Sequence, residues 1–250
     1  LQKVLMQHHI MTPLPLFVLP MVLMPGEIQE LRVFEPRYRQ MLDDCLLDDR
    51  NFGLVMNDPF QPTNGWDGPR QQGCEVEILH HETKGSNHFL QIIGRRRFTV
   101  RNILEPALPP FSDPIFESLV GEDGLLPDLQ TLLEMIPENT QHSKLYISAE
   151  VEYHSPEEET TTEQQDVLRS ILDHVLKRIG AVLRIEEETL IQWVKERVDS
   201  SVSSDPNSVY IVSSLVVNEL ESKQQILASD TLDEAIQELL NHLEMFQEEE

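Results

Sequence analysis

The spacing of apolar residues changes once along this chain, and that change constrains the fold more than any other feature. Up to residue 156, short runs alternate apolar and polar residues, as in 145–151, and Pro and Gly interrupt them. Alternation is typical of strands that bury one face. After residue 163, apolar residues recur at helical spacing, as in 167–179. The sequence therefore predicts an α+β fold in which a β-rich part precedes a helical bundle.

The same change places the expected domain boundaries. Residues 1–11 are expected to be a disordered extension outside the fold, and 12–156 form the β-rich domain. Within it, the Pro-rich stretch 106–144 is expected to be an insertion on the surface. Residues 157–163 are polar and acidic, as linkers are, and 164–247 make up the helical subdomain.

The β-rich part divides further at its turn residues. Alternating or apolar runs predict strands at 28–34, 52–56, 74–79, 89–93, 98–104 and 145–151. Glu35-Pro36 predicts the start of a helix, because Pro suits the first helical position. The three Pro and three Gly of 58–73 predict a long loop, and 84–87 predict a hairpin turn. Gly94 is expected to form a tight turn between two strands.

The helical part carries its own start and stop signals. The first helix is expected to end at Gly180, and a second to cover 186–198. Asp205-Pro206 predicts the start of a third helix, whose apolar stripe reaches Leu220. Thr231 and Glu234 have the spacing of a capping box that starts a last helix. A further helix is expected at 125–136, inside the insertion.

The charge balance excludes several classes of partner. The chain has 19 Lys and Arg against 44 Asp and Glu, a net charge of −25. Such a surface repels phosphate backbones and anionic lipids, so neither nucleic acid nor a membrane is an expected partner. The two cysteines, Cys45 and Cys74, cannot build a disulfide framework and are expected to be buried thiols of a reducing, cytoplasmic compartment.

Three clusters have the composition of metal or anion sites. His80, His81 and His88 follow Cys74, and such side chains can bind zinc, but a polar hairpin end is the preferred interpretation. A second cluster is Arg95-Arg96-Arg97, which we expect to be a charged turn or edge strand and not a phosphate site. Likewise, acidic residues 157–159 are expected to be solvated linker and not a calcium site, so no metal and no cofactor is expected.

Several runs, in this order, resemble one family. They are 14–26 (LPLFVLPMVLMPG), 31–41 (LRVFEPRYRQM), 52–55 (FGLV), 73–76 (GCEV) and 93–98 (IGRRRF). Together they resemble the amino-terminal, substrate-binding domain of Lon proteases, strongly up to residue 103 and weakly on to 247. The resemblance implies a PUA-like β barrel or curled antiparallel sheet with one helix, followed by a helical bundle.

The resemblance also implies a function. In the family this domain engages exposed segments of substrate proteins, and the sequence contains no phosphate-binding loop or nucleophile motif of an ATPase or protease. We therefore expect a non-catalytic polypeptide-binding module and no enzyme. Its expected partners are unfolded or partly folded polypeptides, with a separate protease or ATPase as a candidate further partner. The alternative is an adaptor that binds one dedicated folded protein.

Six of the matched residues are candidates for contact with a bound polypeptide. They are Phe34, Glu35, Arg37, Tyr38, Arg97 and Phe98. The competing interpretation is that they maintain the fold. Arg37 is expected to pair with Glu35 or another carboxylate, and alternation predicts that Phe98 lies in the core.

Overall fold

The computed structural model describes residues 12–117, 119 and 127–248, and they form an α+β fold. The strands are β1 (Leu14–Leu19), β2 (Ile28–Val33), β3 (Phe52–Thr63), β4 (Trp66–Lys84), β5 (Asn87–Leu104) and β6 (Ser148–Tyr153). The helices are α1 (Pro36–Leu47), α2 (Leu129–Glu134), α3 (Thr162–Val182), α4 (Glu187–Ser201), α5 (Asn207–Val216), α6 (Leu220–Ala228) and α7 (Leu232–Glu248), with a 3-10 turn at Pro114–Phe116. The expected extension, 1–11, and residues 125 and 126 of the helix expected in the insertion lie outside the described residues.

The strands close into a barrel. β1 pairs with β3, β3 with β4, β4 with β5, β5 with β6, and β6 returns to β1. The β1–β3 pair is parallel, which departs from the expected antiparallel sheet, and every other pair is antiparallel. β2 stands outside this ring and pairs with the first half of β5. The barrel or curled sheet expected from the family resemblance is thus confirmed.

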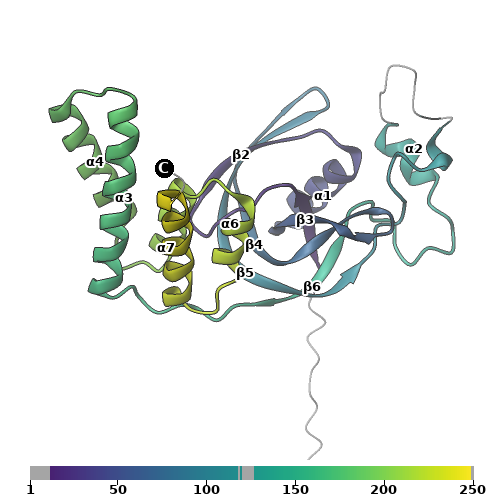
Figure 1. Cartoon of the computed structure of the whole chain (residues 1–250). Coiled ribbons are helices and arrows are strands. Elements are labelled where there is room, and N and C mark those ends of the chain that lie inside the picture. The colour runs from purple at the N-terminus through teal and green to yellow at the C-terminus, as the bar shows by residue number, and fades with distance from the viewer. Residues whose placement is uncertain (1–11, 118, 120–126, 249–250) are drawn as a thin grey trace, which may run out of the picture.

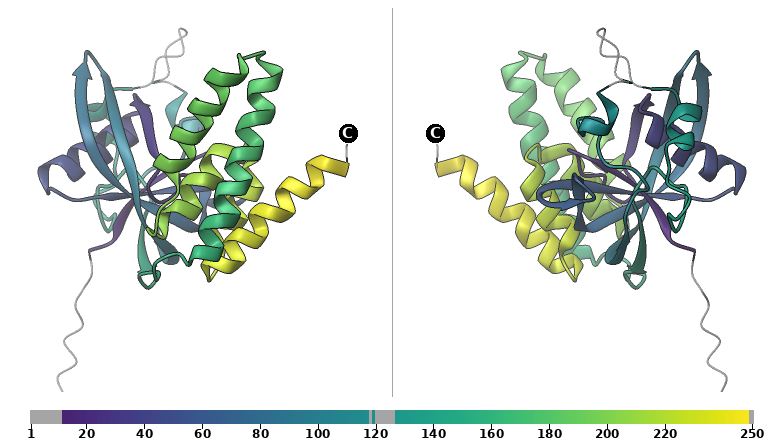
Figure 2. Two further views of the ribbon diagram at one scale, coloured as in Figure 1. Left: turned by 90° about the vertical axis from the view of Figure 1, so that its left-hand side faces the viewer. Right: turned by 90° about the vertical axis from the view of Figure 1, so that its right-hand side faces the viewer.

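The helices lie at both ends of the barrel. Figure 1 shows α3 and α4 as a hairpin at one end of the molecule, α6 and α7 between that hairpin and the barrel, and α2 at the opposite end. The side views show α7 running away from the barrel toward the C-terminus (Figure 2). Every helix within the described residues is too short or too polar to cross a membrane.

Helix α1 begins where the sequence predicts. Glu35 precedes the helix with extended backbone angles, and Pro36 occupies the first helical position. The expected apolar face is buried at Tyr38, Met41, Leu42 and Cys45, but the side chain of Leu46 is 42% exposed. Burial of these side chains against β1 and the barrel core stabilises the helix, which carries no side-chain cap.

The prediction of a loop at 58–73 was wrong. This stretch forms the ends of β3 and β4, which are joined by Asn64 and Gly65. Both residues have positive φ angles, 47° and 81°, as a two-residue hairpin turn requires. Pro59 and Pro62 are tolerated because they lie where the ladder is irregular, between Asp58 and Thr63.

The prediction of a turn at Gly94 was also wrong. Residues 89–93 and 98–104 belong to one continuous strand, β5, and Gly94 lies inside it. A Cβ atom at Gly94 would lie 2.2 Å from the carbonyl oxygen of Met24. The backbone of 94 instead bonds the chain before β2, with Gly26 N–H donating to Gly94 O at 2.9 Å and Gly94 N–H donating to Glu27 O at 3.0 Å. Gly94 is therefore required for close approach and not for a turn.

The helical part differs from expectation at three boundaries. Gly180 does not end α3, which runs to Val182; a Cβ atom at Gly180 would lie 2.2 Å from Leu190 Cδ1 of α4. The third helix ends at Val216, and Leu220 starts a separate helix, α6. Asp205 was expected to be the N-cap of the third helix, but the N-cap of α5 is Pro206; the Asp205 carboxylate still accepts from Asn207 N–H at 2.8 Å. In the β-rich part, β6 starts at Ser148, later than the alternation from 145 suggests.

The barrel and the helices share a hydrophobic core. Val22 and Met24, which lie between β1 and β2, pack with Met56 of β3 against the buried faces of the helices. A separate cluster under the 106–144 stretch contains Leu108, Phe116, Leu132 and Leu145. The domain boundaries expected from the sequence stay a prediction.

We predict that Gly94→Ala lowers the free energy of unfolding by about 3 kcal/mol, because the new methyl group overlaps a backbone carbonyl that cannot move away. Urea denaturation monitored by circular dichroism measures this. The matched control is Gly85→Ala in the adjacent hairpin turn, where a Cβ atom has nothing within 4 Å. The only expected cost of that variant comes from placing Ala at a positive φ of 61°, which is about 1 kcal/mol. Equal losses for the two variants would contradict this role of Gly94.

Candidate functional site

A hollow of about 440 Å³ opens beside the start of α1, and we call it the Arg37 hollow. Its walls come from β1, the first turn of α1, the β3–β4 hairpin and the 106–144 stretch. The residues that line it are Val18, Leu19, Pro20, Glu35, Arg37, Tyr38, Asn57, Gly65, Trp66, Asp67, Pro110 and Ser112. Segments far apart in the sequence thus meet at one place on the surface.

Arg37 is held between two aromatic rings. Its guanidinium carbon lies 3.7 Å from the centroid of the Trp66 ring and 4.2 Å from that of Tyr38. Arg37 Nε also donates to Glu35 Oε2 at 2.9 Å, as the sequence predicted. A cation over an aromatic face is stabilised by the negative face of the ring. The stack fixes the side chains of both aromatic residues in the wall.

Each aromatic ring is also tied to the backbone of another segment. Tyr38 OH donates to the carbonyl oxygen of Val18 at 2.8 Å. Burial raises the pKa of Tyr38, so the hydroxyl stays neutral and remains a donor. Trp66 Nε1 donates to Leu108 O at 3.0 Å, and its ring packs edge to face on Phe111 at 5.3 Å. The wall is therefore preorganised.

The rim of the hollow is acidic. Asp67 is exposed, and its carboxylate accepts from Asn57 Nδ2 at 2.7 Å. Among the residues that the structure describes, Asp67 has no cation within ion-pair distance. Its charge is thus free to act on an incoming molecule. The hollow combines an aromatic wall, a stacked arginine and an unneutralised carboxylate.

The structure brings together the candidates predicted from the helix start. Glu35, Arg37 and Tyr38 line the hollow. Phe34 precedes them, and its side chain is 56% exposed with the Arg32 guanidinium 5.5 Å from its ring. Trp66, the other aromatic residue of the wall, was missed because 58–73 was interpreted as a loop. Asn64-Gly65 was the signal that would have placed Trp66 at the start of a strand.

Arg97 does not belong to this hollow. It is 5% exposed and lies where the barrel meets the helical part. Its Nη1 donates to Leu227 O at 2.9 Å and also to Ser229 O, while Nη2 is paired with Glu157. With its guanidinium committed to these partners, Arg97 holds the α6–α7 connection and the linker against β5. These contacts favour the competing interpretation of Arg97, that it maintains the fold.

Glu157 is held from a second side by Tyr210. The Tyr210 hydroxyl donates to Glu157 Oε1 at 2.6 Å, and its ring centroid lies 5.1 Å from the Arg97 guanidinium. Burial raises the pKa of Tyr210 and keeps the donor in place. Glu157 was expected to be solvated linker, but it is one member of a partly buried network that we call the Arg97 joint, formed by Arg97, Glu157, Tyr210 and the carbonyls of Leu227 and Ser229.

Phe98 is a core residue, as its alternation predicts. It is fully buried, and a Cβ atom added at Gly53 or Gly73 would lie 2.6 Å from its ring. The glycines of the neighbouring strands make room for this ring. Phe98 is therefore inaccessible to a polypeptide docking on the surface.

The arginine cluster is not a turn or an edge. All three residues lie inside β5, where Arg95 Nε pairs with Glu77 at 2.6 Å and Arg96 Nε pairs with Glu75 at 2.8 Å. Burial raises the pKa of Glu75, but hydrogen bonds from Arg96 and Tyr153 outweigh it and hold the pKa below its usual range. Each arginine has its own carboxylate, so the cluster does not attract a phosphate.

The cysteine and histidine side chains do not converge. Cys74 is fully buried, and burial raises the pKa of its thiol, which disfavours the thiolate that zinc needs. His81 Nε2 and His88 Nδ1 lie 3.1 Å apart across the β4–β5 hairpin. In the described part of the chain, no group of three or more His, Cys, Asp or Glu is placed to hold a metal ion.

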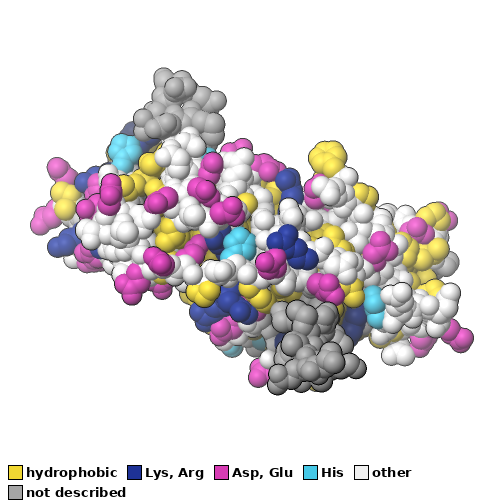
Figure 3. Space-filling model, turned by 90° about the horizontal axis from the view of Figure 1, so that it is seen from below, with side chains coloured by type: hydrophobic (Ala, Val, Ile, Leu, Met, Phe, Trp, Pro, Cys, Tyr) yellow, Lys and Arg dark blue, Asp and Glu magenta, His cyan; other side chains and the backbone are white. Residues whose placement is uncertain are grey.

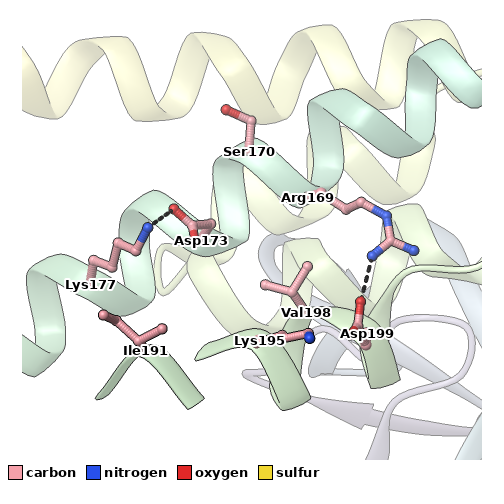
Figure 4. Close-up of a pocket in the computed structure, with 8 residues that line it drawn as sticks. All are labelled: Arg169, Ser170, Asp173, Lys177, Ile191, Lys195, Val198 and Asp199. Atoms are coloured by element: carbon pink, nitrogen blue, oxygen red, sulfur yellow. Dashed lines mark hydrogen bonds and ion pairs between the residues drawn. The ribbon is translucent and has the colours of Figure 1, made fainter. Parts of the chain in front are cut away.

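A second hollow, of about 370 Å³, lies between α3 and α4 (Figure 4). Two ion pairs lie in it, since Lys177 Nζ lies 2.8 Å from Asp173 and Arg169 Nη1 lies 2.9 Å from Asp199. The Arg37 hollow differs from the α3–α4 hollow in its aromatic wall.

Acidic side chains are spread over the face of the molecule seen in Figure 3.

Comparison with known proteins identifies the family. The model of the ATP-dependent protease La (LON) substrate-binding domain matches residues 13–245. The chain belongs to this family. The match is to a substrate-binding domain, and no protease or ATPase domain was matched in the chain. No curated protein matches it.

Two solved structures share the fold. The Lon N-terminal domain protein from Xanthomonas campestris has a TM-score of 0.55 and 20% identity, over 92% of this chain and 98% of that one. The N terminal domain of Mycobacterium avium complex Lon protease has a TM-score of 0.57 and 14% identity, over 92% of this chain and 97% of that one. At these identities, the similarity establishes the LON fold alone.

We predict that Arg97→Ala in this LON domain lowers the free energy of unfolding by about 3–5 kcal/mol, because it leaves Glu157 without its cation and the carbonyls of Leu227 and Ser229 without the Arg97 donor. Thermal and urea unfolding measure the loss. Arg95→Ala, on the same strand, removes an exposed ion pair and is expected to cost at most about 0.5 kcal/mol. The role assigned to Arg97 is wrong if the two variants are equally stable.

Proposed function

We propose that this LON domain is a non-catalytic module that binds unfolded or exposed segments of other proteins, and that the Arg37 hollow is where they bind. The observation that carries the proposal is the preorganised wall of the Arg37 hollow, in which Trp66 and Arg37 are partly exposed and Tyr38 is buried behind Arg37. Membership of a substrate-binding family supports protein substrates as the ligands.

The composition of the hollow suits a polypeptide. Tryptophan, tyrosine and arginine dominate the energetics of protein interfaces, because each offers a large contact area with a polar end. Pro20 and Pro110 extend the apolar surface, and Asn57 and Ser112 add groups that can bond a peptide backbone. Hydrogen bonds to a peptide backbone do not depend on the client sequence, as a module for unfolded segments requires.

Charge is expected to select among the segments. The chain carries −25 overall, and the unneutralised carboxylate of Asp67 lies at the rim of the hollow. Acidic segments are repelled at long range, whereas basic and neutral segments are not. Clients are therefore expected to be apolar segments that carry Lys or Arg, and their binding should weaken as salt screens the attraction.

We predict saturable binding of a labelled, permanently unfolded protein, with a dissociation constant in about the micromolar range. Fluorescence anisotropy of the labelled client, titrated with this chain, measures it, and the native form of the same client is the control. Trp66→Ala is expected to weaken binding by about tenfold or more, since it removes the wall of the hollow.

Trp193→Ala is the matched control for that variant. Trp193, the other tryptophan of the chain, lies on α4 and is 41% exposed, so its replacement should leave binding unchanged. Asp67→Lys reverses the rim charge without touching the wall and should weaken binding of a basic client by about threefold. Equal binding of unfolded and native client, or equal effects of the two tryptophan variants, would contradict the proposal.

A further inference from the structure

Strand β2 has an open edge. It pairs with β5 along its whole length, from Ile28 opposite Ile93 to Val33 opposite His88. No other described strand pairs with its second side, whereas the barrel strands close on each other. An open edge presents backbone N–H and C=O groups that can pair with another strand. Here the Glu30 carbonyl accepts a hydrogen bond from a side chain of its own strand, Gln29 Nε2, at 3.1 Å.

The exposed side chains of this edge alternate in character. Ile28 and Phe34, at its two ends, are each 56% exposed. Between them lie the exposed side chains of Glu30 and Arg32, and neither makes an ion pair with any residue that the structure describes. Arg32 Nε instead donates to the amide oxygen of Asn87 at 2.9 Å. The edge therefore carries an unpaired anion and an unpaired cation, flanked by apolar side chains.

We propose that β2 pairs antiparallel with β2 of a second copy of this chain, about a twofold axis at Leu31. In that register Leu31 faces Leu31 of the second copy, and each residue before position 31 faces the residue that lies equally far after it. Glu30 then faces Arg32 of the second copy, and Arg32 faces its Glu30. Ile28 likewise faces position 34, where Phe34 follows the strand. A twofold interface must be complementary to itself, and this sequence is.

The charge pattern favours a second copy over an arbitrary extended segment. Opposite charges that face each other across antiparallel strands are stabilising, and like charges are destabilising. The twofold axis makes this pair occur twice, so Glu30 and Arg32 of each copy both gain a partner of opposite charge. The pairing buries a small area and brings together two chains of −25, so the dimer is expected to be weak and to form at high protein concentration.

Charge reversal at the edge tests the register. Sedimentation equilibrium at about 0.15 M salt should show the 28.9 kDa chain in a concentration-dependent equilibrium with a particle of twice that mass. Glu30→Arg places Arg opposite Arg, and Arg32→Glu places Glu opposite Glu. Each should raise the dissociation constant by about tenfold or more. The double variant with both changes restores opposite charges and should dimerise like the wild type.

Glu150→Arg is the matched control, because Glu150 is an exposed glutamate on β6, a strand that pairs with both β1 and β5, and it should leave the equilibrium unchanged. A double variant as monomeric as the single ones would overturn this register. A wild type that stays at 28.9 kDa throughout would overturn the pairing itself. If the chain stays monomeric and Glu30→Arg also weakens binding of the unfolded client, the edge belongs to client segments and not to a second copy.

Discussion

The rest of the structure depends on one buried cation. Arg97 lies inside β5, and its guanidinium bonds the linker through Glu157 and the α6–α7 connection through the carbonyls of Leu227 and Ser229. Burying a cation costs free energy unless its donors have partners. If these segments separated, the buried Arg97 charge would lose its partners, so it holds them together. The barrel and helices also share the cluster around Met24. The Arg97 joint therefore helps to fix the helical part on the barrel.

The sequence predicted the fold class because burial follows periodicity. The alternation and the helical stripes indicated the β-rich and helical parts, and Glu35-Pro36 located the start of α1. Predictions failed where a contact distant in sequence decides local structure. Gly94 looks like a turn residue, but its place in β5 is decided by the carbonyl of Met24. Gly180 looks like a helix end, but Leu190 of the next helix requires a small residue there.

The candidate site was predicted in part for the same reason. Glu35, Arg37 and Tyr38 adjoin each other in sequence, so a single motif identified them. Trp66 completes the wall through a bond to Leu108, 42 residues away, and nothing in the local sequence announces that contact. Arg97 is a candidate from the sequence because it belongs to the IGRRRF run that resembles the family, and only the positions of Glu157 and Tyr210 show that it is committed to the joint.

The most direct test of the account is to follow the two tryptophan indole N–H signals by ¹⁵N–¹H correlation NMR during titration with an unfolded protein. Trp66 lies in the Arg37 hollow and Trp193 lies on α4, so the two signals report on separate surfaces. The account predicts that the Trp66 signal shifts or broadens as the client is added, while the Trp193 signal stays in place. A Trp193 signal that moves while Trp66 does not would contradict binding at the Arg37 hollow.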